Sequence, residues 1–281
     1  MHMTSEKQTQ AVHRHPYDPI LFKMKFAFFF GVCGADRDRY FAIKGRLIRA
    51  AASLGLYECE NLRMLRRFVA PGDTVLDIGA NAGVYSVALA RLTGASGAVI
   101  AFEPLSFLIP ELTRCTRSLP AVSIEVAAVG KSPQPVVEIR VPLLYGKIPE
   151  PALATLQSCA HKSEQFDVVL TTIDQYRNRC PRISFIKMDV EGHELEALQG
   201  GRTTLLSDRP VIQFESNKGS PTTSAIDSLA MELRYIRAVV VRGTLTPLIP
   251  ATETMNRNHY LIPAERSDLY SRKDAPLKSA P

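Results

Sequence analysis

The sequence of 281 residues contains no apolar stretch long enough to cross a lipid bilayer. Residues 26–34 (FAFFFGVCG) fall short of the about 20 apolar residues that a membrane helix needs, and they lack the long apolar region and cleavage site of a signal peptide. Glycine (16 residues) and proline (19 residues) are too scarce for a low-complexity chain. Hydrophobic residues make up 46% and charged residues 22%, which excludes a disordered or collagen-like chain. We expect a soluble cytoplasmic protein of one or two domains.

Recognisable cysteine pairs are missing too. The cysteines are odd in number, widely spaced and without a C-x-x-C motif: Cys33, Cys59, Cys115, Cys159 and Cys180. This pattern indicates neither a disulfide framework nor a zinc site, so reduced thiols are expected. His13 and His15, near the N-terminus, are only weak evidence for a metal.

The positive charge is confined to the first quarter of the chain. The net charge is +6, residues 1–70 hold 12 basic and 6 acidic residues, and the two signs balance over residues 71–281. A basic segment can attract a nucleic acid, a phosphorylated substrate or a membrane surface. Apolar residues interrupt the basic runs around Arg49 and Arg66, however, which favours the solvated faces of amphipathic helices.

Hydrophobic periodicity divides the chain into three parts. Residues 1–20 are polar and predict a loose tail, and helical spacing between 21 and 69 predicts two or three helices. From residue 71, short apolar runs alternate with helix-length segments, as in a parallel sheet covered by helices. These runs are 75–78, 99–102, 122–126, 185–188 and 211–214.

The remaining segments complete the expected organisation. Residues 136–141 and 168–172 predict an additional strand and a surface loop, and residues 235–244 and 259–262 predict a terminal pair of strands. We therefore expect an N-terminal tail and helical cap (1–70), one α/β domain (71–265) and a polar C-terminal tail (266–281).

A glycine-rich turn follows the first predicted strand. In residues 74–86 (TVLDIGANAGVYS), the predicted strand ends at Asp77, and a helix begins after Gly83. Small residues between them allow a tight turn and a close approach to a ligand. Such a turn lies at the carboxyl ends of the strands, where open α/β sheets bind ligands.

The identity of these residues indicates which ligand binds. A dinucleotide fingerprint would need glycine where Asn81 and Val84 stand, and no phosphate-binding loop is present. The carboxylate of Asp77 would repel phosphate and suits an ammonium group. A ligand with a ribose, an amino acid and no phosphate meets these needs, which predicts S-adenosylmethionine (SAM).

A second acidic residue supports this prediction. Glu103 ends the next strand and can accept both ribose hydroxyls, while Pro104 stops the strand and fixes the carboxylate. Taken singly, Asp77 could cap a helix and Glu103 could be a surface acid. Residues 127–130 (AAVG), with Ala128, are expected either to form a wall of the adenine pocket or to serve only packing.

Ionisable residues cluster again in residues 186–196 (IKMDVEGHELE). Lys187, Asp189 and Glu191 alternate along a predicted strand and project at one end of the sheet, where charges are costly unless paired or functional. The following residues are less informative. His193 stands in the first helical turn, and Glu194 and Glu196 are expected to complement the helix N-terminus.

Four ordered motifs together resemble the FkbM family of SAM-dependent methyltransferases. They are residues 76–86 (LDIGANAGVYS), 101–104 (AFEP), 185–194 (FIKMDVEGHE) and 209–215 (RPVIQFE). The resemblance covers about residues 71–265 and implies a class I (Rossmann-like) α/β fold. It implies a seven-stranded sheet with helices on both faces, and methyl transfer to oxygen, often of a sugar or polyketide.

The resemblance carries over to individual positions. The family's cofactor motifs match Asp77, Gly79, Asn81, Gly83 and Glu103, and its active-site stretch matches Asp189, Glu191 and His193. From the residues themselves, we add Ala80, Pro104 and Ala128 to the candidate cofactor-binding residues and Lys187 to the candidate active-site residues. A small-molecule or glycan hydroxyl is the expected acceptor. We expect His193 or Asp189 to remove its proton, Glu191 to orient the base or the acceptor, and Lys187 to pair with a carboxylate.

Other functions stay open at this point. A divalent metal held by Asp189 and Glu191 would acidify the hydroxyl, although it is not favoured. A nucleic-acid methyltransferase would use the basic N-terminal region, but the sequence has neither an N/D-P-P-Y/F tetrapeptide nor a catalytic Pro-Cys pair. A non-catalytic SAM-binding module would not need residues 187–193, and a nicotinamide dehydrogenase would need the missing third glycine.

Overall fold

The computed structural model describes Cys33 and residues 36–144, 148–156, 162–177, 179–216, 221–250 and 258–271. The chain divides into two compact units, Met1–Phe41 and Ala42–Pro281, and the division falls inside α2 (Arg37–Ser53). In the first unit, the rings of Tyr40 and Phe41 meet edge to face. The expected tail 1–20, most of the apolar stretch 26–34, Cys159 and residues 272–281 lie outside the described residues.

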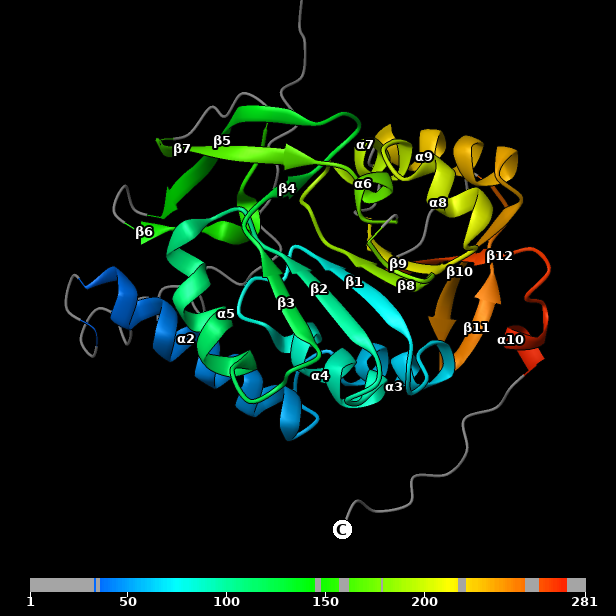
Figure 1. Ribbon diagram of the computed structural model, residues 1–281, viewed down its shortest axis with the longest axis horizontal. Helices are drawn as coiled ribbons and strands as arrows, with labels where there is room; N and C mark the ends of the chain where they lie inside the picture. Colours follow the sequence, from blue (N-terminus) through cyan, green and yellow to red (C-terminus); the bar gives the residue numbers. More distant parts are fainter. Residues whose placement is uncertain are drawn as a thin grey trace, which may run out of the picture. The chain divides into compact units, whose positions relative to one another are not determined.

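An eight-stranded sheet forms the centre of the second unit, in the order β11-β10-β12-β9-β8-β1-β2-β3 (Figure 1). Its strands are β1 (Thr74–Ile78), β2 (Ala98–Phe102), β3 (Val122–Glu125), β8 (Ile183–Met188), β9 (Val211–Glu215), β10 (Tyr235–Val241), β11 (Thr244–Pro247) and β12 (Asn258–Pro263). The five strands from β9 to β3 are parallel, whereas β12 runs antiparallel to both β9 and β10. All five residues of β1 are buried, which explains why its sequence is mostly apolar, with Asp77 as the one ionisable residue.

The predicted parallel sheet is thus confirmed, but its strand count is eight rather than seven. Residues 235–244, expected to form one strand, make β10 and the start of β11, which are joined by Arg242 and Gly243. Both joining residues have positive φ (51° and 75°), as a tight two-residue hairpin requires. The hairpin therefore adds one antiparallel strand at the edge of the sheet.

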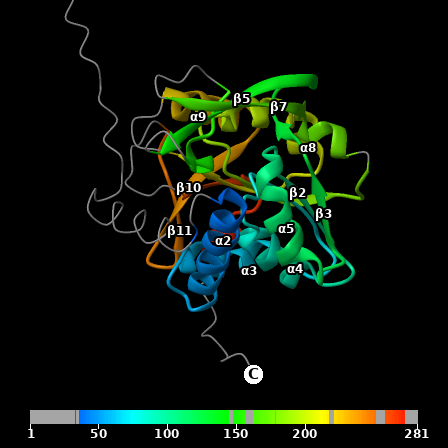
Figure 2. The ribbon, with the colours of Figure 1, turned by 90° about the vertical axis from the view of Figure 1, so that its left-hand side faces the viewer.

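Helices cover both faces of this sheet (Figures 1 and 2). One face carries α3 (Cys59–Phe68), α4 (Val84–Thr93) and α5 (Ile109–Thr116), and the other carries α6 (Ile173–Arg177), α7 (Glu194–Gln199), α8 (Arg202–Ser207) and α9 (Pro221–Glu232). Phe68 of α3 stacks on Phe185 of β8, with ring centroids 5.9 Å apart. On the opposite face, Leu198 and Leu205 are buried against the sheet. The remaining helices among the described residues are short: η1 (Ser106–Leu108), η2 (Pro151–Leu153) and α10 (Asp268–Ser271).

A second sheet lies between β3 and β8 in the chain, where an additional strand and a surface loop were expected. It has the order β4-β7-β5-β6, with β4 (Ala128–Val129), β5 (Gln134–Leu144), β6 (Ile148–Pro149) and β7 (Ser163–Thr171). Ile139 and Val141 of β5 are buried, while Glu138 is exposed. This half-buried alternation suits an antiparallel sheet, and β5 does pair antiparallel with β7.

The described residues also bear on membrane insertion and on disulfide formation. None of their helices has both the length and the apolar character that crossing a membrane requires. Their four cysteines are free thiols: Cys33, Cys59, Cys115 and Cys180.

Candidate functional site

The glycine turn joins the end of β1 to the start of α4. The amides of Gly79 and Ala80 both donate to the carbonyl oxygen of Phe102, at 3.0 and 2.9 Å, which anchors the turn to the end of β2. Gly79, Asn81 and Gly83 all have positive φ. A Cβ on Gly79 would lie 2.0 Å from the backbone oxygen of Asp189, so only glycine fits there. The turn therefore packs against the residue that follows β8.

Asp77 lies inside β1, directly before this turn, and is 1% exposed. Its Oδ2 accepts a hydrogen bond of 2.5 Å from Ser86 Oγ, whereas its Oδ1 has no hydrogen-bond partner among the described residues. Burial raises the pKa of the Asp77 carboxyl, and the Lys187 ammonium and the Ser86 hydroxyl act against that rise. Asp77 is not a helix cap, because Gly83 stands at the N-cap of α4. Its buried free oxygen is suited to a donor from a ligand.

Glu103 follows β2 and is 4% exposed, so it is not a surface acid. Its two oxygens accept hydrogen bonds of 2.9 Å from the backbone amides of Asn81 and Leu105. Burial raises the pKa of Glu103 to about 7 in spite of these bonds. The carboxylate thus joins the glycine turn to the turn after β2, and the half-buried Pro104 lies within the second turn.

The two alanines proposed for the cofactor site are both buried but belong to different parts of the fold. Ala80 packs with Ala101 and Leu112 under the glycine turn. Ala128 begins β4 and therefore belongs to the second sheet, paired with Leu170. Its role as a wall of the adenine pocket stays a prediction.

Lys187 is the register partner of Asp77 on the neighbouring strand β8, so the two side chains share a face of the sheet. The lysine is 3% exposed, its Nζ lies 3.3 Å from Asp189 Oδ2, and it lies 4.7 Å from the centroid of the Tyr85 ring. β8 ends at Met188, so Asp189 and Glu191 do not continue the alternation expected from the sequence. They lie in a turn, because Glu191 adopts a left-handed backbone with φ of 50°.

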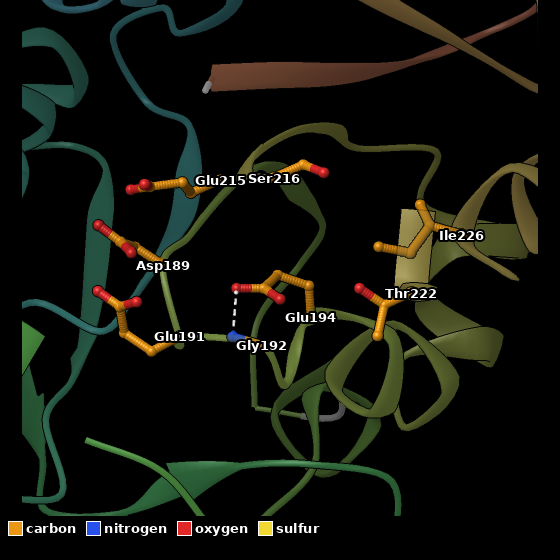
Figure 3. Close-up of a pocket in the computed structure, with 8 residues that line it drawn as sticks. All are labelled: Asp189, Glu191, Gly192, Glu194, Glu215, Ser216, Thr222 and Ile226. Carbon is orange, nitrogen blue, oxygen red and sulfur yellow. Dashed lines mark hydrogen bonds between the residues drawn. The ribbon is translucent and has the colours of Figure 1, made fainter. Parts of the chain in front are cut away.

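Glu194, at the start of α7, holds this turn in place. Its Oε1 accepts hydrogen bonds from the amides of Val190 (3.4 Å) and Gly192 (3.2 Å), the two neighbours of Glu191. Figure 3 shows the bond to Gly192. The sequence predicted only that Glu194 would complement a helix terminus. His193 lies beside Glu196, with Nδ1 3.4 Å from Oε2.

A pocket opens beside this turn, and four carboxylates contribute to it (Figure 3). Its lining residues are Asp189, Glu191, Gly192, Glu194, Glu215, Ser216, Thr222 and Ile226. His193 is not among them, so the structure brings Asp189 and Glu191 together without His193. Within the described ranges, no group of three or more His, Cys, Asp or Glu residues has the arrangement of a metal site.

Several residues near the site were missed by the sequence reasoning. Tyr85 of α4 donates a hydrogen bond of 3.1 Å to Glu58 Oε2 and accepts one of 3.1 Å from Gln213 Nε2. Gln213 also donates to Asn258 Oδ1 at 3.0 Å. Gln213 alone left a visible signal, because it is a polar residue within the apolar run of β9.

Arg49 was expected on a solvated basic face, but it contacts the glycine turn. Its Nη1 donates a hydrogen bond of 2.8 Å to the carbonyl oxygen of Ala82, and its Nη2 pairs with Glu111. Gly45, one helical turn earlier, leaves room for Glu111, since a Cβ there would lie 2.7 Å from Glu111 Oε1. An arginine from the N-terminal helices therefore supports the turn.

A family of known proteins matches this chain. Residues 77–237, more than half of the chain, match the family model of the methyltransferase FkbM domain. A search of curated proteins gives no match. The matching solved structures include a methyltransferase FkbM from Methylobacillus flagellatus KT, with 15% identity and a TM-score of 0.43. That match covers 86% of this chain and 60% of the other, so this chain spans less than two thirds of that relative.

Two more solved structures match at similar levels. A SAM-dependent methyltransferase from Aquifex aeolicus has 15% identity and a TM-score of 0.40, over 78% of this chain and 97% of the other. Fibrillarin from Aeropyrum pernix, solved with natively bound SAM, has 12% identity and a TM-score of 0.43, over 72% of each chain. The family model extends from Asp77 through the turn after β8 to Arg237. The chain belongs to the FkbM family of SAM-dependent methyltransferases.

Proposed function

We propose that this protein transfers a methyl group from SAM to a hydroxyl group of a small molecule or glycan, such as a sugar or polyketide. The observation that carries the proposal is the pair of buried carboxylates, Asp77 and Glu103, on either side of a turn without bulky side chains. Asp189 lies directly against that turn and lines a pocket.

The residues present fit the cofactor. Asp77 Oδ1, buried and without a partner among the described residues, would accept the ammonium group of the amino-acid part. Glu103 would accept the ribose hydroxyls, because each carboxylate oxygen can accept more than the one hydrogen bond it has here. Gly79 and Gly83 present no side chain to the ligand, and Asn81 between them shares their left-handed backbone. When bound, SAM supplies a methyl group activated by a positively charged sulfur.

Asp189 is the residue we assign as the general base. It lines the pocket, and 36% of its side chain is exposed, so it can reach an acceptor hydroxyl. It would accept the proton of the acceptor hydroxyl when the methyl group passes from sulfur to the acceptor oxygen and S-adenosylhomocysteine is released, a contribution of about 10²–10⁴-fold in rate. Lys187 pairs with Asp189, and Glu191 orients the acceptor from the same pocket. Alignment of the acceptor beside the glycine turn provides the larger share of the catalysis.

We also propose a cellular compartment and domain boundaries for this protein. The four free thiols among the described residues are typical of a reducing compartment, and we propose the cytoplasm. We also propose that residues 71–265 form the methyltransferase domain, with residues 1–70 as a helical cap and residues 266–281 as a tail.

Radioactive SAM incubated with the protein and a fractionated cell extract tests the proposal. Label should accumulate in a small molecule or glycan as a methyl ether, and Asp77→Asn should abolish this labelling. Asp73, four residues earlier and only partly buried, gives the matched control Asp73→Asn. Label found mainly in protein or nucleic acid would refute the hydroxyl acceptor, and a wild-type protein that binds no S-adenosylhomocysteine would refute the cofactor.

A further inference from the structure

The ammonium group of Lys187 is buried beside the proposed cofactor site. A buried charge is costly unless neighbouring groups compensate it, and this one faces two carboxylates of different roles. Asp77 is its register neighbour on β1, and Asp189 Oδ2 lies 3.3 Å from Nζ. Any displacement of the ammonium therefore changes how its charge is shared between these carboxylates.

The ring of Tyr85 limits that displacement. It lies 4.7 Å from the Lys187 ammonium, within the range of a cation–π contact, which is strongest at sites removed from water. Tyr85 comes from α4, directly after the glycine turn, so the contact also ties that turn to β8.

The hydroxyl of Tyr85 is held as firmly as its ring. It donates to Glu58 Oε2 and accepts from Gln213 Nε2, and the amide of Gln213 is fixed in turn by Asn258. Burial, followed by the charge of Glu58, raises the pKa of the Tyr85 hydroxyl well above its usual value. The phenol thus stays protonated and remains a donor at neutral pH.

We propose that Tyr85 is a positioning residue of the methyltransferase, whose ring fixes the Lys187 ammonium between Asp77 on the cofactor side and Asp189 on the acceptor side. The inference rests on the proposed cofactor role of Asp77. It also gives Glu58, outside the matched family domain, an indirect part in the site. Glu58 adopts a left-handed backbone with φ of 50°, which is uncommon for a residue with a side chain and is often found at functional sites.

The pH dependence of S-adenosylhomocysteine binding, followed by calorimetry between pH 5 and 9, tests the proposal. Asp77 must be ionised to accept the ligand's ammonium, so binding weakens as the pH falls through the pKa of Asp77. Three groups act on Asp77: Lys187 from β8, Asp189 from the turn after β8, and Ser86 from α4. Glu103 feels the charge of Asp77 and titrates in every variant, so only differences between variants are informative.

Tyr85→Leu should move the acid limb upward by about one pH unit, equal to about tenfold weaker binding on that limb. Tyr85→Phe keeps the ring but loses both hydroxyl bonds, and it should move the limb less, by about threefold in affinity. Lys187→Met should produce at least the shift of Tyr85→Leu. Tyr235→Leu is the matched control, because it removes another buried ring, 4.4 Å from Arg209, and should leave the limb unmoved.

The experiment distinguishes a failure of the proposed function from a failure of the inference about Tyr85. If the wild-type protein binds no S-adenosylhomocysteine at any pH, the proposed function fails and this inference falls with it. If it binds but Tyr85→Leu keeps the wild-type acid limb, Tyr85 has a merely structural role and the inference alone is overturned. Should Tyr85→Leu not fold, an unmoved limb in Lys187→Met overturns the inference, because the ammonium held by the ring would then have no effect on Asp77.

Discussion

The backbone oxygen of Asp189 lies where a side chain on Gly79 would have to be, only 2.0 Å from a Cβ built at that position. The amide of Asp189 donates at the same time to the carbonyl oxygen of Ile78, at 2.9 Å. The turn proposed to hold the cofactor and the residue proposed as the base are therefore in direct backbone contact. Their separation is set by the main chain rather than by side chains.

Gly79→Ala should consequently disrupt both parts of the site. A left-handed backbone costs an L-residue roughly 1–2 kcal/mol, and at this position the overlap with Asp189 is added. We expect loss of S-adenosylhomocysteine binding in calorimetry and a clearly lower melting temperature. Gly72→Ala is the matched control, because Gly72 has a similar φ of 89° but its nearest contact would be 3.8 Å away. Equal effects of the two substitutions would contradict the role of the contact.

Arg49→Met should weaken binding of S-adenosylhomocysteine by about tenfold, since hydrogen bonds from charged groups contribute about 1.5–3 kcal/mol. The arginine supports the carbonyl of Ala82, and Glu111 keeps Arg114 as a partner when Arg49 is lost. Arg46→Met removes an exposed arginine from the same helix and should change nothing. The same affinity in both variants would show that the bond to Ala82 does not shape the turn.

The raised pKa of Glu103, about 7, predicts opposite effects of pH on stability and on binding. The unfolded carboxyl titrates near its ordinary pKa of about 4.3, so the folded protein binds the proton more tightly. The contribution of Glu103 to the free energy of unfolding is therefore fully present below that pKa and is lost as the pH rises through 7. Cofactor affinity should instead fall as the pH drops below 7, because the ribose loses its anionic partner.

Thermal melts of the free protein and calorimetric titrations, both between pH 5 and 8.5, check this prediction. Glu103→Gln should flatten both dependences around pH 7. A stability profile with the same slope there in the wild type and in Glu103→Gln would contradict it.

The assignment of the base can be tested once the labelling experiment has identified the acceptor. Asp189→Asn should lower kcat by about 10²–10⁴-fold with little change in cofactor affinity, because only proton removal is lost. His193→Ala should retain most of the activity, since His193 does not line the pocket. The opposite ranking of these two variants would move the role of the base to His193.

The sequence predicted the parallel part of the fold well because its strands are buried on both faces. Short, mostly apolar runs such as residues 75–78, in which only Asp77 is polar, have few other interpretations, and β1 is indeed entirely buried. The second sheet was harder to predict, because residues 134–144 alternate and contain two prolines, Pro135 and Pro142. The hairpin after Val241 depends on positive φ angles at Arg242 and Gly243, and these two residue types predict such angles only weakly.

Some residues of the candidate site could be predicted from the sequence, and others could not. Motifs that are local in sequence, around Asp77 and Asp189, could be read from the residues. The partners of Tyr85 and Arg49 could not, because they depend on contacts across distant segments. Tyr85 meets Gln213, 128 residues away, and Arg49 meets Ala82, 33 residues away. Whether a basic residue is solvated or paired is decided by packing, which periodicity does not contain.

The second sheet leaves the main fold and returns to it through neighbouring strands, because Val129 of β4 pairs with Thr171 of β7 and the amide of Gly130 donates to the Thr171 carbonyl. Both ends of the excursion are thus clamped before it extends outward. Evolution can lengthen, shorten or exchange such a clamped appendage with little disturbance to the strands on either side. We therefore expect insertions to be tolerated best in the part of this sheet beyond the clamp, away from β4 and the end of β7.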